Sequence, residues 1–243
     1  SWSVSSNVED FFKQRKTALF ENESLHCLVF SAIKRAQNDI KAAEEHTFFT
    51  FQEPSGCSAH AFAANNGEDL VLGPMTQIQA EQLRVFIDKI GIQARNIEGP
   101  RNAVLNFAES WTQATNRPHL VQMNQGLYEL TQLTMPDVGD GTLVIATDQH
   151  QDLLRQFMMG FMGDCFQNNQ VHTGKINARV KRLIQEKKGV LWQNRGGELV
   201  SMAAVVRESP NTTSISLVYT PPEHRGCGYA AHVVAALSQQ QFD

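Results

Sequence analysis

The sequence predicts a mixed α+β protein in which two successive halves each combine a mostly antiparallel sheet with flanking helices. Short runs of β-forming residues, separated by glycine and proline turns, alternate with longer stretches that carry apolar residues at helical spacing. The same order of two helices, three strands and a helix then occurs twice along the 243 residues. This repetition predicts two domains, residues 1–135 and 136–243.

The first half opens with apolar residues at helical spacing over residues 8–36, which predicts one or two helices. A glycine, Gly91, stands where a helix would end. The further expected elements are strands at 47–51, 59–64 and 69–72, a helix at 76–90, a strand at 93–97, a helix at 101–114 and a long strand at 119–133. Residues 136–141, with two glycines and two aspartates, are the expected linker.

The second half repeats this order after the linker. Asp148 is the expected cap of its first helix, which should run to about residue 165. The other expected elements are a strand at 143–146, a helix at 174–188, strands at 190–193, 200–206 and 214–219, and a helix at 229–237. A further strand, helix and strand complete the first half, so the second is expected to lack that portion in this sequence.

Composition excludes several classes of function. With 21 Lys and Arg against 25 Asp and Glu, the net charge is -4, so the basic excess needed for nucleic acid is missing. No apolar run approaches the roughly 20 residues that cross a bilayer. The His and Cys residues show no metal-ligand spacing, so no catalytic metal is expected. Four scattered cysteines without a C-x-x-C pair favour a reducing cytoplasm: Cys27, Cys57, Cys165 and Cys227.

The segment with the clearest chemical signal is the glycine loop at residues 220–228, which lies between an expected strand and an expected helix. The first amides of a helix have no partner within the helix, so they can bind phosphate oxygens. Gly226 and Gly228 let the backbone approach such a ligand, and Arg225 adds a positive charge beside it. The loop matches neither the Walker pattern nor the dinucleotide fingerprint.

Residues 217–230, LVYTPPEHRGCGYA, resemble the central motif Q/R-x-x-G-x-G/A of the GNAT superfamily of N-acetyltransferases. Gly226 and Gly228 match it, whereas Glu223 departs from its first position. The resemblance covers about residues 143–243 and implies tandem GNAT-like domains. The first half would be a degenerate copy, because its equivalent loop, residues 72–76, has one glycine and contains Pro74, which removes an N–H donor.

The resemblance implies that acetyl-CoA is the co-substrate and that a primary amine, on a small molecule or a peptide, attacks its thioester directly. The net charge and the lack of a long apolar run predict no nucleic-acid or membrane partner, and a homodimer is left open. The general base is unknown, since residues 211–214 contain no acid, and Glu208 is only a weak candidate. The implied coenzyme-binding residues are Leu217, Val218, Tyr219, His224, Arg225, Gly226, Cys227, Gly228, Tyr229 and Ala230.

Two other functions stay open on the sequence. The departure at Glu223 and the lack of a base favour a non-catalytic CoA-binding sensor or scaffold. A tandem-domain transferase that uses another acyl donor is the second alternative. The cluster of Phe and Met at residues 157–162 is interpreted as core or, alternatively, as the lining of an acceptor pocket.

Overall fold

The computed structural model describes residues 1–137, 141–165 and 173–242. It divides into two compact units, Ser1–Tyr128 and Glu129–Asp243. Each unit has its own sheet and its own hydrophobic clusters. The domain boundary predicted between residues 135 and 136 lies inside the second unit.

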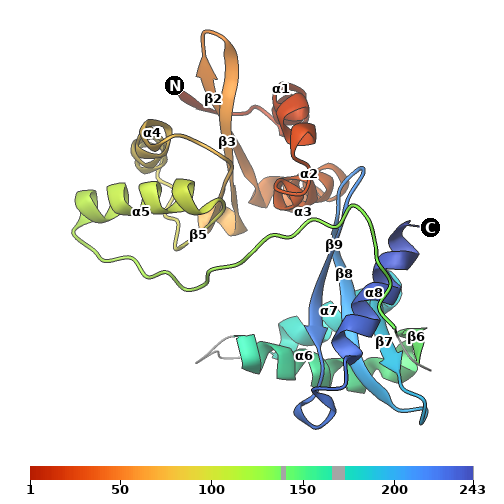
Figure 1. Ribbon diagram of the computed structural model, residues 1–243. Coiled ribbons are helices and arrows are strands. Elements are labelled where there is room, and N and C mark those ends of the chain that lie inside the picture. The colour runs from red at the N-terminus through yellow and green to blue at the C-terminus, as the bar shows by residue number, and fades with distance from the viewer. Residues whose placement is uncertain (138–140, 166–172, 243) are drawn as a thin grey trace. The chain divides into compact units, whose positions relative to one another are not determined.

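The N-terminal unit contains a five-stranded sheet in the order β1-β2-β3-β4-β5, in which only β4 and β5 are parallel (Figure 1). Its elements are β1 (Trp2–Val4), α1 (Val8–Glu21), α2 (Cys27–Asn38), α3 (Ile40–Glu45), β2 (Thr47–Glu53), β3 (Gly56–Ala64), a short 3-10 turn η1 (Asn65–Gly67), β4 (Asp69–Leu72), α4 (Gln77–Lys89), β5 (Asn96–Glu98) and α5 (Arg101–Thr115).

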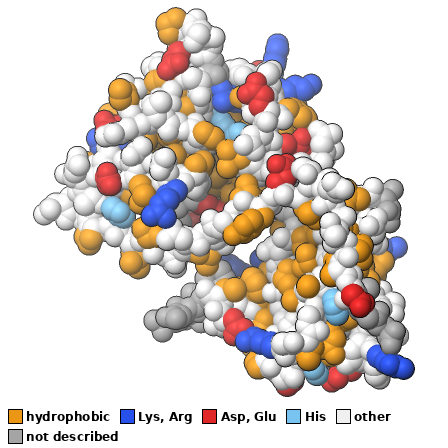
Figure 2. All heavy atoms as spheres, in the orientation of Figure 1, with side chains coloured by type: hydrophobic (Ala, Val, Ile, Leu, Met, Phe, Trp, Pro, Cys, Tyr) orange, Lys and Arg blue, Asp and Glu red, His pale blue; other side chains and the backbone are white. Residues whose placement is uncertain are grey.

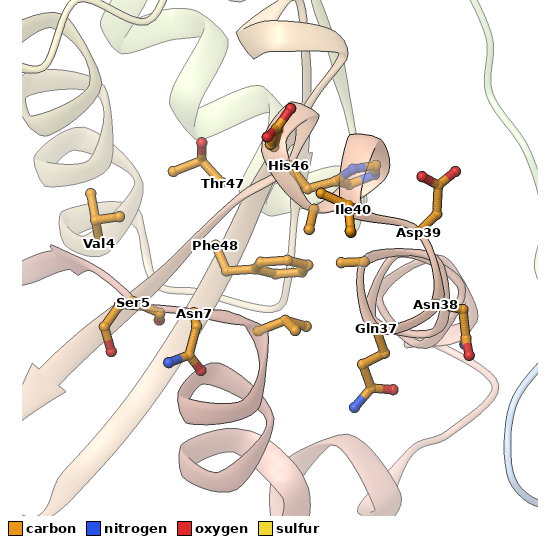
Figure 3. Close-up of a pocket in the computed structure, with 15 residues that line it drawn as sticks. Val4, Ser5, Asn7, Gln37, Asn38, Asp39, Ile40, His46, Thr47 and Phe48 are labelled. Carbon is orange, nitrogen blue, oxygen red and sulfur yellow. The ribbon is translucent and has the colours of Figure 1, made fainter.

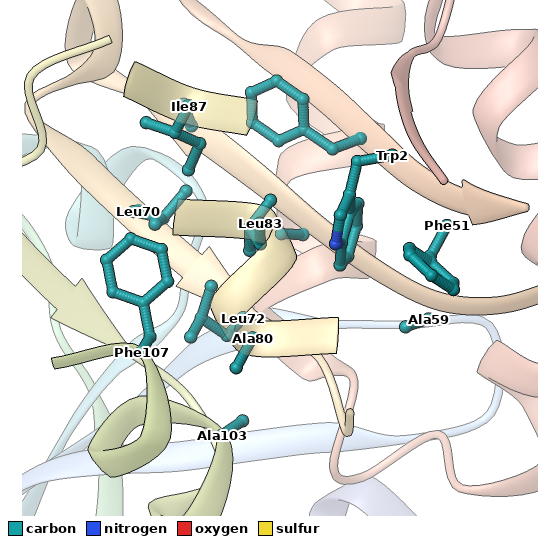
Figure 4. Close-up of a cluster of buried hydrophobic side chains, with 13 residues drawn as sticks. Trp2, Phe51, Ala59, Leu70, Leu72, Ala80, Leu83, Ile87, Ala103 and Phe107 are labelled. Carbon is teal, nitrogen blue, oxygen red and sulfur yellow. The ribbon is translucent and has the colours of Figure 1, made fainter. Parts of the chain in front are cut away.

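Helices cover both faces of this sheet. Successive side chains of a strand point to opposite faces, so Phe48 and Phe49 of β2 enter different clusters. Phe48 packs in the cluster that α1 and α2 form, and Phe49 packs in the cluster that α4 and α5 form. Figure 4 shows the second of these clusters. Trp2 lies in the second of these clusters and donates a hydrogen bond from its Nε1 to the carbonyl of Gln79 at 2.8 Å.

The C-terminal unit contains an antiparallel sheet in the order β6-β7-β8-β9. Leu191 and Trp192 are neighbours in β7 and point to opposite faces of the sheet. Helices α6 and α7 cover the face of Leu191, and α8 covers the face of Trp192. The elements are β6 (Thr142–Ile145), a 3-10 turn η2 (Asp148–His150), α6 (Gln151–Cys165), α7 (Thr173–Gln185), β7 (Gly189–Gln193), β8 (Leu199–Glu208), β9 (Thr213–Tyr219), a 3-10 turn η3 (Pro222–His224) and α8 (Tyr229–Phe242).

The long strand predicted at 119–133 is wrong. The structure assigns neither helix nor strand to residues 116–137, and Leu120 and Tyr128 are 88% and 92% exposed. The segment alternates in sequence, but it has no strand beside it to hydrogen-bond and no apolar face to cover, and both are needed to hold a strand in water. Part of the expected linker, residues 138–140, lies outside the described residues.

The other differences from the sequence prediction concern element ends and short elements. Thr147, rather than Asp148, precedes the first turn of the C-terminal unit, and its N–H donates to His150 Nδ1 at 3.0 Å. Strand β1 and helix α3 were not predicted, because three and six residues are too few to show a period.

Two surface properties bear on partners. On the face drawn in Figure 2, the Lys and Arg side chains are scattered between apolar and acidic ones rather than gathered in one field. No helix in the described part of the chain is long and apolar enough to span a bilayer.

Candidate functional site

Strand β9 lies at the edge of the C-terminal sheet, and its backbone is bent by a bulge. Met202 pairs with Tyr219 and Ala204 with Ser216, so two residues of β9 stand opposite Ala203 alone. Leu217, one of the two, has φ +56°, a left-handed conformation that a residue with a side chain seldom adopts. Its side chain is only 3% exposed and packs against α6 and α7. This packing holds the strained backbone in place.

The loop after β9 is fixed by contacts with its neighbours. Ser201 Oγ donates to the carbonyl of Tyr219 at 3.1 Å and lies 2.9 Å from Thr220 Oγ1. The side chain of Arg225 folds back over the loop: its Nε donates to the carbonyl of Thr220 at 2.9 Å, and its Nη2 pairs with Asp164 Oδ2 of α6 at 2.5 Å. These bonds hold the loop against α6.

The start of α8 has the geometry of an anion site. Gly226 and Gly228 both have φ +80°, and a Cβ added to Gly226 would meet no atom within 4 Å. The first helical hydrogen bond runs from His232 N to Gly228 O at 3.1 Å. In the part of the chain that the structure describes, no group accepts a hydrogen bond from the amides of residues 226–231. These N–H groups therefore border open space at the positive end of a helix.

The equivalent position in the N-terminal unit is already occupied by the protein itself. Helix α4 follows β4 there, and Thr76 Oγ1 accepts from the N–H of Gln79 at 3.3 Å while Gln79 Oε1 accepts from the N–H of Thr76 at 2.9 Å. This capping box satisfies the amides that a phosphate would need. Only the C-terminal unit thus keeps a free helix start after its third meander strand.

The remaining predicted coenzyme residues lie around this loop. Tyr219 packs its ring on Phe157 with the ring centroids 5.9 Å apart, and His224 Nε2 lies 3.4 Å from Glu198 Oε1. Cys227 is exposed. Val218 and Tyr229 pack on the α8 side of the sheet. The side chains of this motif therefore shape the loop, and its groups without a protein partner among the described residues are the backbone amides of residues 226–231.

Glu208, the weak candidate for the base, lies away from the loop. It pairs with Thr213, at the end of β9 opposite to Tyr219, and its Oε2 accepts from Lys188 Nζ at 3.0 Å. Burial would lower the pKa of Lys188, but its hydrogen bonds to Glu186 and Glu208 raise it. Lys188 therefore stays charged and holds the Glu208 carboxylate in an ion pair.

A hollow of about 540 Å³ in the N-terminal unit is a weaker candidate site (Figure 3). It lies where α1 and α3 begin, and its polar groups already serve those helices: Asn7 Oδ1 accepts from the N–H of Asp10 at 2.8 Å, and Asp39 Oδ1 from that of Lys41 at 2.9 Å. The hollow follows from two helix caps. Among the described residues no group of three His, Cys, Asp or Glu could hold a metal ion.

Several residues of this site could not be recognised in the sequence. Asp164 and Ser201 hold the loop from α6 and β8, far away along the chain, and Gly160 leaves room for the Tyr219 ring. In the cluster at 157–162, Phe157 and Met158 are core, whereas Met159 is 44% exposed. Of these residues, only Gly160 could be noticed in the sequence, because a glycine inside a predicted helix is unusual.

Neither the protein-family models nor the curated proteins contain a match to this chain. A GNAT-family acetyltransferase from Colwellia psychrerythraea aligns over 100% of this chain and 85% of its own, with a TM-score of 0.50 and 15% identity. The chain has the GNAT fold. It is built from two GNAT-like units, each with its helices on both faces of a largely antiparallel sheet.

Two further solved structures align with the chain at lower TM-scores. A GCN5-related N-acetyltransferase from Sphaerobacter thermophilus covers 90% of this chain and 79% of its own, at 12% identity and TM-score 0.48. A predicted acetyltransferase from Clostridium acetobutylicum, solved with acetyl-CoA, covers 41% of this chain and 72% of its own, at 18% identity and TM-score 0.35.

Proposed function

We propose that the C-terminal unit binds acetyl-CoA and transfers its acetyl group to a primary amine. The free start of α8 carries this proposal: Gly226 and Gly228 at φ +80° precede amides without a protein acceptor, next to a bulged edge strand. Such a helix start suits a pyrophosphate, because its N–H groups and the helix dipole both favour negative charge. The acceptor would be a small-molecule or peptide amine.

Each part of the loop then has a role in binding. The amides of residues 226–230 would hold the pyrophosphate, and the backbone of edge strand β9 would hold the pantetheine arm. Acetyl-CoA supplies a thioester that an amine can attack directly. The backbone at the Leu217 bulge would donate to the acetyl carbonyl, where negative charge develops during the attack.

A CoA-binding module without catalysis is the second candidate, and one observation favours it. The Lys188 ion pair engages Glu208, the only carboxylate that the sequence offered as a base. Both candidates use the same loop. The two candidates differ in one observable result: a transferase consumes bound acetyl-CoA when amines are added, and a binding module does not.

The loop assignment is tested by Gly226→Ala, with Gly197→Ala as the matched control. Gly197, in the turn between β7 and β8, has φ +83°, and its added Cβ would come no closer than 4.0 Å to another atom. Both alanines carry the same left-handed strain, about 1–2 kcal/mol. Only the one at position 226 places a methyl group where the pyrophosphate would lie.

Isothermal titration with CoA gives the readout. We expect Gly226→Ala to weaken CoA binding about tenfold or more, which corresponds to losing a hydrogen bond to a charged group, while Gly197→Ala binds as the wild type does. Equal affinity in the two variants would refute the site. Release of free CoA thiol from acetyl-CoA in the presence of mixed amines would identify a transferase, and its absence a binding module.

A further inference from the structure

Three arginines of the C-terminal unit lie on the α6–α7 side of its sheet. Arg179 and Arg182 are three residues apart on α7, so they share one side of that helix. Arg207 of β8 pairs with Ser214 of β9. Ser214 lies two residues before Ser216, whose partner Ala204 belongs to the α6–α7 cluster, so Ser214 and Arg207 point to that face.

These arginines have no acidic partner among the described residues. Several other cations of the unit do: Arg155, Lys188 and Arg225 each form an ion pair with an acid. None of Arg179, Arg182 and Arg207 forms such a pair with a described residue.

Two of the three arginines are partly desolvated, since Arg179 and Arg207 are half-buried, whereas Arg182 is exposed. Arg179 is half-buried, and its pKa is lowered by burial first and then by the charges of Arg182 and Arg207. Like charges held together away from water cost stability. An anion between them would remove this cost, and such unfavourable groupings are typical of functional sites.

The cluster lies within reach of the proposed point of transfer. Ser214 precedes Leu217 by three residues, a distance of about 10 Å along a strand. On this face β9 carries Ser214 and Ser216, whose small polar side chains are only partly buried. Ser214 and Ser216 therefore form a polar stretch of this face between the bulge at Leu217 and Arg207, which pairs with Ser214.

We propose that the amine acceptor carries an anionic group, carboxylate or phosphate, and that Arg179, Arg182 and Arg207 bind this group. The inference rests on the proposed acetyl transfer and names its acceptor class. Guanidinium groups suit both anions, because their planar donors match two oxygens at once. The amine would then lie at the bulge, several bonds away from its own charged end.

A binding experiment that needs no turnover tests the cluster. Glutarate is titrated into the wild type, Arg179→Gln, Lys181→Gln and Gly226→Ala, and binding is followed by the shift of the melting temperature. Lys181 is the control, because it is exposed on the same helix but two residues away from Arg179, on another side. We expect Arg179→Gln to weaken glutarate binding about tenfold, as the loss of one charged hydrogen-bond donor implies, and the other two to leave it unchanged.

The same variants keep the two proposals apart. CoA affinity should fall in Gly226→Ala and stay unchanged in Arg179→Gln, the reverse of the glutarate result. Without its anion, Arg179→Gln should melt at the same or a higher temperature than the wild type, because a repelled, half-buried charge is gone. Equal glutarate affinity in Arg179→Gln and Lys181→Gln, or a lower melting temperature in Arg179→Gln, overturns the inference.

An acceptor series completes the test. The wild type should acetylate 4-aminobutyrate or 2-aminoethyl phosphate with a higher kcat/KM than butylamine, and Arg179→Gln should lose this preference mainly through KM. The better of the two acids identifies the anion. Preference for butylamine, or a preference for acids that survives Arg179→Gln, would contradict the assignment.

Discussion

Acid should destabilise the N-terminal unit through two buried histidines. His60 of β3 is 0% exposed, and His26, which precedes α2, is 5% exposed, with their ring centroids 5.0 Å apart. None of the four ring nitrogens has a hydrogen-bond partner among the described residues. Burial, and then the charge of Arg15, lowers the pKa of His26 from 6.5 to about 4 and that of His60 well below its ordinary value.

The sign and size of the effect follow from proton uptake. Between pH 6.5 and about 4, the unfolded chain protonates both histidines, whereas the folded unit keeps them neutral. The unfolded state then binds more protons, so the free energy of unfolding falls as the pH falls. Each histidine contributes a slope approaching about 1.4 kcal/mol per pH unit, or about 2.7 for both. Above about pH 6.5 both histidines are neutral in the folded and the unfolded chain, so they no longer make the free energy of unfolding depend on pH.

Urea unfolding at a series of pH values measures this slope. Hydrogen exchange in peptides of β3 and α2 serves as the readout, because it reports on the N-terminal unit. His60→Leu replaces one buried ring by an apolar side chain of similar size and should remove about half of the slope. His119→Leu is the control, since it removes a histidine that is exposed rather than buried. An unchanged slope in His60→Leu, or stability that rises on acidification, would refute the reasoning.

Three further substitutions test the C-terminal unit. Gly160→Ala places a Cβ against the Tyr219 hydroxyl and should cost about 1–3 kcal/mol in urea unfolding, and adding Tyr219→Leu should recover part of this loss, whereas additive losses would contradict the contact. Glu223→Gln should leave CoA affinity unchanged or raise it modestly in a titration, because an exposed negative charge near the loop is removed; a large loss would mean that the Glu223 side chain binds. Lys188→Met should lower stability by less than about 1 kcal/mol, since Glu186 and Glu208 can turn to water, and a larger loss would show a stronger ion-pair network.

The sequence alone predicted the elements whose signals are local. The structure confirmed the strands predicted at 47–51 and 190–193 and the helices predicted at 76–90 and 101–114. In each of them, apolar residues at a period of 2 or 3.6 indicate which face of the element will be buried. The glycine loop was found for the same reason, since a free helix start needs only a few neighbouring residues. The strand predicted at 119–133 was wrong for a related reason. Its alternating pattern is a local property of the sequence, whereas a strand also needs a neighbouring strand, which can come from a distant part of the chain.

The tertiary structure alone decided how the loop after β9 is held and which charged groups of different elements interact. The residues next to Leu217 in the sequence do not predict its left-handed backbone conformation, which depends on packing against α6 and α7. The bond from Arg225 to Asp164 joins residues 61 positions apart. Arg179 and Arg207 belong to different elements, and their charges interact only because α7 packs on that face of the sheet. Residue spacing along a chain encodes which groups share a helix or strand face, but charges on different elements become neighbours only when the core between them is packed.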